Sequence, residues 1–235
     1  SYFDEVEAEL ETAPADAFGG PDCAHDSFTD IQKAINYSMT SFFTTGGIRG
    51  GKKKMDKFYP RSFNMGVRRE VYQALGGFSK MRFGEDIDFS IRIFKGGYKC
   101  RLFPGAWVYH KRRTDLKKFF KQVHNSGIAR INLYKKYPES LKLVHLLPAA
   151  FTLGVALLLA GGLFCPYSLL PILFYALLVC VDSACCNHSL RIGVYSIAAS
   201  FIQLIGYGTG FWRAWWQRCI LKRGEFEAFQ KNFYK

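Results

Sequence analysis

Residues 62–98 read SFNMGVRREVYQALGGFSKMRFGEDIDFSIRIFKGGY, and this stretch decides the expected fold. Helices are predicted over 68–75 and 85–94, because each of these segments ends at a pair of glycines that can stop a helix. Short strands are predicted around them, at 17–21, 61–66, 98–103 and 106–110. Short strands that alternate with helices are typical of an α/β domain.

The second of these helices begins with three acidic residues, Glu85, Asp86 and Asp88. Acids in a first turn complement the helix dipole and cap free amides, which alone would explain them. Glu85 and Asp86 are neighbours in sequence and cannot share one helix face. One of the two can therefore be structural while the other points into a cleft.

The order of motifs around these acids resembles the family 2 glycosyltransferases over about residues 17–130. The matching elements are an Asn-x-Gly segment followed by Arg, a Gly-Gly-Phe, the Glu-Asp pair, an Arg within the helix and a Gly-Tyr before a strand, at Asn64–Arg68, Gly76–Phe78, Glu85-Asp86, Arg92 and Gly97-Tyr98. The similarity continues through PGAWVYH at 104–110. It implies an α/β fold that is part of a GT-A domain, the nucleotide-diphospho-sugar transferase fold.

The resemblance implies that Asp86 is the general base of an inverting sugar transfer and that Glu85 orients its neighbours. Such a transfer needs one carboxylate to take the proton of the acceptor hydroxyl as its oxygen attacks the anomeric carbon. Retention by double displacement would require a second carboxylate as nucleophile. Asp88 is expected on the helix surface or in packing.

The same resemblance implies a set of substrate-binding residues, namely Asn64, Gly66, Arg112, Arg113 and Gln122. The two arginines could neutralise a departing diphosphate, or they could be solvated surface residues. His110 could bind a divalent metal or the diphosphate, or it could be a hydrogen-bonded structural residue. Gln122 is only loosely similar to the Gln/Arg-x-x-Arg-Trp motif of related synthases, which argues against a processive polymer synthase.

The donor site of GT-A enzymes uses an Asp-x-Asp motif, and none precedes Glu85 here. Residues 2–10 resemble the helix that follows that motif, so we expect the chain to begin after the nucleotide-binding half. A divalent cation, Mg²⁺ or Mn²⁺, is then expected to bind mainly through residues missing from this chain. We also expect the 235-residue chain to be inactive alone.

Three apolar stretches, at 146–164, 167–186 and 192–212, each approach the roughly 20 residues that a helix needs to cross hydrocarbon. Lys and Arg before the first stretch and Arg191 after the second place both flanks in the cytoplasm. A third crossing would export the basic tail. The glycine-rich third stretch could instead be re-entrant or interfacial, and both alternatives stay open.

The net charge of +13 lies mostly in the middle of the chain, where residues 49–113 carry seventeen basic and five acidic side chains. Such an excess suits lipid head groups, nucleotide diphosphates or nucleic acid. The run Lys52–Lys54, in a glycine-rich loop at 44–54, is too short for nucleic acid, and the apolar stretches also argue against it. The seven cysteines match no zinc spacing and are interpreted as reduced thiols packed as small hydrophobes.

These observations predict four regions: an acceptor-side part of a GT-A domain at 1–112, basic amphipathic interface helices at 113–144, two or three transmembrane helices at 145–212, and a basic aromatic tail at 213–235. The leading hypothesis is a multi-pass inner-membrane glycosyltransferase with its catalytic part in the cytoplasm. It would move a sugar from a nucleotide-sugar donor to a lipid-linked or cell-surface polysaccharide acceptor. The alternative is a catalytically inactive, membrane-tethered protein that binds glycans or lipids or acts as a scaffold.

Overall fold

The computed structural model describes residues 1–45, 58–226 and 229, and the chain divides into two compact units. The first unit contains Ser1–His25, the described part of Gly50–Lys111, and the tail residues Phe226 and Phe229. The second contains Asp26–Arg49, as far as it is described, and Arg112–Glu225. This grouping differs from the predicted regions, since 26–45 packs with the later helices. Most of the predicted loop at 44–54 lies outside the described residues.

The first unit is built on a three-stranded sheet in the order β3-β1-β4, with β1 (Ala17–Gly19), β3 (Met65–Val67) and β4 (Cys100–Leu102). The central strand pairs antiparallel with β3 and parallel with β4. A second, parallel pair joins β2 (Asp22–Cys23) to β5 (Val108–Tyr109). The strand expected at 61–66 starts only at Met65, because Arg61–Asn64 forms a turn closed by a 2.9 Å hydrogen bond from Asn64 N–H to Arg61 C=O.

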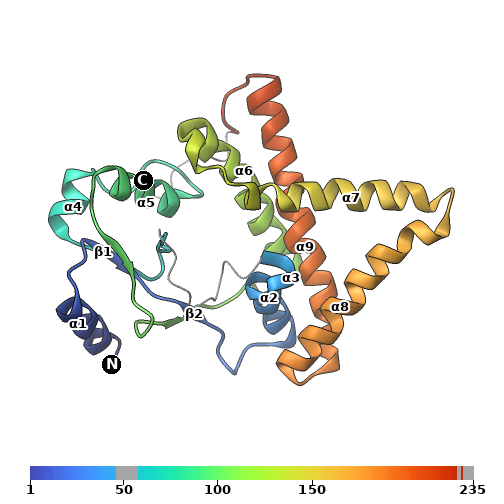
Figure 1. Ribbon diagram of the computed structural model, residues 1–235, viewed down its shortest axis with the longest axis horizontal. Coiled ribbons are helices and arrows are strands. Elements are labelled where there is room, and N and C mark those ends of the chain that lie inside the picture. Colours follow the sequence, from blue (N-terminus) through green and yellow to red (C-terminus); the bar gives the residue numbers. More distant parts are fainter. Residues whose placement is uncertain (46–57, 227–228, 230–235) are drawn as a thin grey trace. The chain divides into compact units, whose positions relative to one another are not determined.

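Three helices accompany these strands: α1 (Tyr2–Thr12), α4 (Arg69–Ala74) and α5 (Glu85–Lys95) (Figure 1). The spacing of Phe89 and Ile93 along α5 places both on one face, where they pack with Ala17 and Val71. The helix ends where predicted, at Gly96. Burial of this apolar face fixes the orientation of α5 and, with it, the direction in which its acidic first turn points.

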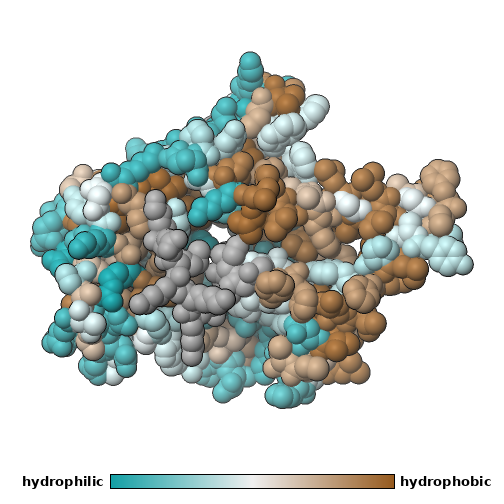
Figure 2. Space-filling model, viewed as in Figure 1, coloured by the Kyte–Doolittle hydropathy of each residue, from teal (hydrophilic) through white to brown (hydrophobic). Residues whose placement is uncertain are grey.

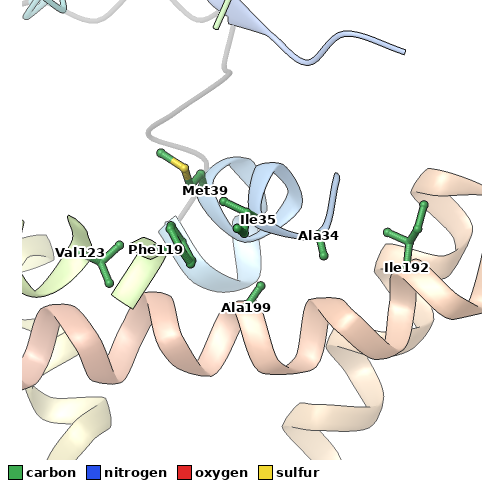
Figure 3. Close-up of a cluster of buried hydrophobic side chains, with 7 residues drawn as sticks. All are labelled: Ala34, Ile35, Met39, Phe119, Val123, Ile192 and Ala199. Carbon is green, nitrogen blue, oxygen red and sulfur yellow. The ribbon is translucent and has the colours of Figure 1, made fainter. Parts of the chain in front are cut away.

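The second unit is helical and consists of α2 (Asp30–Thr40), α3 (Phe42–Thr45), α6 (Leu116–Lys136), α7 (Leu147–Gly162), α8 (Leu170–Asn187) and α9 (Leu190–Trp215). Its buried cluster joins α2, α6 and α9 through side chains that Figure 3 shows together: Ala34, Ile35, Met39, Phe119, Val123, Ile192 and Ala199. In the region predicted at 113–144 as basic amphipathic helices, the structure has one long helix, α6, and its apolar face packs on α9.

Three helical segments are long and apolar enough to span a membrane: Leu143–Gly162, Pro166–Asn187 and Leu190–Ile220. The first two form a helical hairpin through a 3-10 turn at Pro166–Leu169, directly after Cys165 (Figure 1). The side of α7 and α8 seen in Figure 2 is mostly hydrophobic. The third segment continues past residue 212 into a π-helical turn at Trp216–Ile220.

All seven cysteines are free thiols, which agrees with the prediction that they are reduced. The prediction that they pack as small hydrophobes is wrong for four of them, because Cys23, Cys165, Cys185 and Cys186 are exposed. Cys165 lies at the tip of the hairpin, and Cys185 and Cys186 lie near the end of α8, where apolar side chains face outward.

Candidate active site

The acidic pair Glu85 and Asp86 stands at the amino-terminus of α5, directly after Gly84, whose φ of 83° turns the chain into the helix. Asp86 is buried, and only 13% of its side chain is exposed. Its Oδ1 accepts a 2.8 Å hydrogen bond from the N–H of Ile87. The carboxylate is therefore held at the positive end of the helix dipole. Glu85 is half-buried, so the two neighbours differ in environment as their positions on the helix require.

Arg61 completes this group, with its guanidinium nitrogen Nη1 lying 3.5 Å from Asp86 Oδ2. None of the sequence motifs assigns a role to Arg61. Its partner is 25 positions away (86 minus 61) and no local motif connects them, so only the three-dimensional fold reveals the pair. An arginine at this distance supplies positive charge beside the carboxylate and restricts its rotation.

The pKa of Glu85 is raised, first by burial and further by the neighbouring charge of Asp86. A raised pKa in the folded state means that folding disfavours the ionised carboxylate. The protonated Glu85 carboxyl therefore contributes fully to stability below the pKa of glutamate in the unfolded chain, about 4.3. This contribution is lost as the pH rises through the pKa of Glu85 in the folded protein.

We therefore expect Glu85→Gln to unfold at a somewhat higher temperature than the wild type near pH ~7, because the amide cannot ionise. Near pH ~3 the two midpoints should converge, since Glu85 is then protonated in both states. Thermal unfolding of the detergent-solubilised protein at both pH values measures this difference. A Glu85→Gln midpoint below that of the wild type near neutral pH would show that ionised Glu85 stabilises the fold.

Asn64 is buried in the first unit, and its amide makes three hydrogen bonds within the protein. Its Oδ1 accepts from Tyr2 Oη at 2.7 Å, and its Nδ2 donates to Ala106 C=O at 2.9 Å and to Pro21 C=O at 3.3 Å. These bonds join α1, the start of β2 and the segment before β5. Because its polar atoms already have protein partners, Asn64 shapes the site through these segments.

Gly66 lies on β3 opposite Phe18 of β1. A methyl group at Gly66 would come within 2.1 Å of the Phe18 ring, which stacks on Phe103 at a centroid distance of 4.6 Å. The glycine is therefore required by aromatic packing across the sheet, a reason that the motif alone does not reveal.

Gly66→Ala should lower the free energy of unfolding by about 1–3 kcal/mol, the usual effect of overpacking a well-filled site. Gly224→Ala is a matched control, because no atom lies within 4 Å of the added methyl group. The double change Gly66→Ala/Phe18→Leu should recover part of the loss. Equal thermal midpoints for Gly66→Ala and Gly224→Ala would contradict this explanation.

His110 follows β5, and its Nδ1 lies 3.6 Å from Asp22 Oδ2 on the neighbouring strand β2. Its ring stacks on Phe63 at 3.9 Å. His110 and Asp22 could supply one nitrogen and one oxygen ligand to a cation. Within the described residues, however, no three His, Cys, Asp or Glu side chains come together as a metal site. The metal role of His110 stays a prediction.

The other predicted substrate contacts, Arg112, Arg113 and Gln122, belong to the second unit. Arg112 is buried and its Nε donates to Asn36 Oδ1 at 3.0 Å, so the alternative of a solvated surface arginine is wrong for this residue. Arg113 is exposed, and its Nε donates to Gln122 Oε1 at 2.9 Å. The structure thus brings Arg113 and Gln122 together at the start of α6.

Asp88 is fully buried, so the alternative that it lies on the helix surface is also wrong. Arg92, one turn later in α5, donates through Nε to Asp88 Oδ2 at 3.0 Å. The same guanidinium donates to the carbonyls of Leu75 and Gly77 at 2.6 and 2.7 Å. The pair therefore fastens α5 to the turn after α4, which explains the Arg and the Gly-Gly of the sequence pattern as structural elements.

A hollow of about 360 Å³ lies beside β3 and α4 in the first unit. Its lining includes the side chains of Arg69, Tyr72 and Phe78, but not Asp86. Aromatic and cationic groups of this kind can contact sugars and phosphates.

Comparison with known proteins defines the class to which this arrangement belongs. The family model described as "Glycosyl transferase family group 2" matches residues 62–198, more than half of the chain, and the chain belongs to this family. A curated relative, the "Probable glycosyltransferase YdaM" of Bacillus subtilis (strain 168), is 30% identical over 59 residues. That match covers 25% of this chain and 14% of the relative, so the chain spans well under two thirds of the relative's length. No solved structure matches the chain.

Proposed function

We propose that this chain carries the acceptor side of an inverting glycosyltransferase of GT-A type, with Asp86 as the general base. Family membership supports glycosyl transfer as the reaction class. The observation that carries the assignment of the base is the position of Asp86: buried, at a helix amino-terminus, and 3.5 Å from Arg61. A fixed carboxylate in this environment suits proton abstraction from a hydroxyl group.

In the proposed reaction, the acceptor oxygen forms a bond to the anomeric carbon of a nucleotide-sugar donor. The bond from that carbon to the diphosphate breaks, and the nucleoside diphosphate leaves with the bonding electrons. Asp86 takes the acceptor proton during the attack. One displacement from the face opposite the leaving group inverts the anomeric configuration, so no second carboxylate is needed as nucleophile.

The remaining site residues have supporting roles in this proposal. Glu85 orients the acidic turn, while Asn64 and Gly66 hold the strands that border it. Arg112, Arg113 and Gln122 are proposed to contact diphosphate or acceptor. Mg²⁺ or Mn²⁺ would neutralise charge on the leaving diphosphate when bound, and His110 with Asp22 could contribute ligands.

The three apolar helices support a membrane location. We propose that the protein lies in the inner membrane with its catalytic part in the cytoplasm, since Lys and Arg flank the hairpin on both sides. This location favours an acceptor that is lipid-linked or part of a cell-surface polysaccharide.

The proposal is tested by supplying nucleotide sugars to membranes that contain the complete natural polypeptide, with lipid extract as acceptor. Acceptor-dependent release of nucleoside diphosphate, with sugar incorporated into the lipid fraction, is expected. Binding of glycan or lipid with no release from any common nucleotide sugar would instead favour the inactive binding protein.

A further inference from the structure

The third apolar helix, α9, differs from α7 and α8 in how it is covered. Each of the three segments contains an apolar stretch of 18 residues. In Leu190–Ile220, which includes α9, 39% of that stretch is buried inside the protein. The corresponding shares are 6% in Leu143–Gly162 and 11% in Pro166–Asn187. Exposed apolar side chains follow α7 and α8 from end to end, and they include Leu153, Leu157, Leu163, Phe164, Leu173 and Leu177. The hairpin thus exposes an apolar surface that suits contact with lipid tails, whereas much of α9 is covered by protein.

The amino-terminal half of α9 packs on α2. Ile192 and Ala199 of α9 share a buried cluster with Ala34 and Ile35 of α2 (Figure 3). At the same end, Arg191 Nε lies 3.3 Å from the carboxylate of Asp30, the first residue of α2.

The carboxy-terminal half of α9 packs on α6 with backbone against backbone. A methyl group at Gly210 would lie 2.0 Å from the carbonyl oxygen of His124, and one at Gly127 would lie 2.1 Å from that of Tyr207. A methyl group at Gly206 would lie 2.6 Å from Val123. Gly206 and Gly210 of α9 therefore allow close contact with α6, a helix that precedes the hairpin.

Two of the helices that pack on α9, α2 and α6, carry too many polar side chains for hydrocarbon. The lysines and arginines of α6 are Lys117, Lys118, Lys121, Arg130, Lys135 and Lys136. At the centre of a bilayer each such residue costs about 2.5–3.5 kcal/mol on insertion scales. Because α2 and α6 together follow α9 over most of its length, α9 cannot be surrounded by lipid tails along that length.

The chain after α9 returns to the first unit. Phe229 is buried there, with 4% of its surface exposed, and its ring packs on Phe83 at a centroid distance of 4.9 Å. Phe83 precedes all three apolar helices in sequence. Residues that pack together lie on one side of a membrane, so the chain between Phe83 and Phe229 must cross it an even number of times.

We propose that α7 and α8 form the single membrane-crossing hairpin of this chain, and that α9 lies along the lipid head groups on the side of the first unit. The partner of this surface is a phospholipid bilayer. Trp212, Trp215 and Trp216, beside Arg213 and Arg218, suit the head-group layer. Trp212 Nε1 donates to Ala149 C=O at 3.0 Å, which joins the end of α9 to the base of α7. The basic tail then stays on the same side of the membrane as the basic residues before α7. With two crossings instead of three, the tail is not exported, as the positive charge on both flanks requires.

The test is labelling by a membrane-impermeant maleimide in intact and in inverted membrane vesicles. Single-cysteine versions of the natural polypeptide would retain Cys23, in the first unit, or Cys165, at the hairpin tip, or would carry Gly224→Cys, just after α9. Cys23 and Gly224→Cys should be labelled from one side and Cys165 from the other. Labelling of Gly224→Cys from the side of Cys165 would show that α9 crosses, and the proposal would be wrong.

A second measurement avoids replacement of the native cysteines, in case those variants fail to fold. A reporter fused after Lys235 in the otherwise unaltered polypeptide shows on which side of the membrane the tail lies. A fluorescent protein serves as the cytoplasmic reporter and a phosphatase as the periplasmic reporter. Activity of a cytoplasmic reporter is expected. A periplasmic reporter signal would contradict the proposal whether or not the protein transfers sugars.

Discussion

Asp86→Asn is expected to lower the rate of sugar transfer about 10²–10⁴-fold, the range that a general base contributes. The amide matches the carboxylate in size and can still contact Ile87 N–H, but it cannot take a proton from the acceptor hydroxyl. Acceptor affinity should change little, so the loss should appear in kcat. The measurement is steady-state transfer by the complete natural polypeptide in membranes or detergent.

Glu70→Gln is the matched control, because Glu70 is also an acid in the first turn of a helix but is exposed. Its transfer rate should equal that of the wild type. Arg61→Met should give an intermediate loss, since Arg61 is expected to act on the reaction by holding the carboxylate of Asp86. Near-normal turnover by Asp86→Asn would remove Asp86 from its proposed role.

The second large effect is expected for Arg92→Leu, which should lower the free energy of unfolding by about 3–5 kcal/mol. This change leaves Asp88 as a buried charge without its guanidinium partner and removes the bonds to Leu75 and Gly77. For a chain of this size the thermal midpoint should fall by about 10 °C. Thermal unfolding in detergent measures the shift.

Two controls separate the loss of the buried ion pair from the loss of packing. The double variant Asp88→Leu/Arg92→Leu should recover much of the lost stability, because two apolar side chains can replace a buried ion pair at little cost. Lys95→Leu, at the exposed end of the same helix, should shift stability by less than about 0.5 kcal/mol. A double variant that is as unstable as Arg92→Leu would show that the pair itself is not the cause.

Local signals in the sequence were sufficient to predict α4 and α5 of the first unit. The span of α5 follows from its acidic first turn, the spacing of Phe89 and Ile93, and the terminal Gly96. The hairpin of α7 and α8 follows from hydropathy and one Cys-Pro-Tyr turn. The strand near 61–66 was misplaced, because a closed turn occupies Arg61–Asn64.

The contacts that define the candidate site could not be predicted, because they join distant parts of the chain. Arg61 and Asp86 are in one site only because β3 and α5 fold together. The amide of Asn64 is occupied by Tyr2, Pro21 and Ala106, and each contact spans more than 40 positions. The buried state of Asp88 likewise depends on the turn after α4, which a helix pattern does not describe.

The stereochemistry of transfer tests the central claim most directly, since one carboxylate acting as a base permits only a single displacement. Proton NMR of the newly formed product, recorded before any equilibration, gives its anomeric configuration relative to that of the donor. The account predicts inversion by the wild type and loss of the signal with Asp86→Asn. A product with the donor's configuration would rule out a single displacement from the opposite face and would contradict the account.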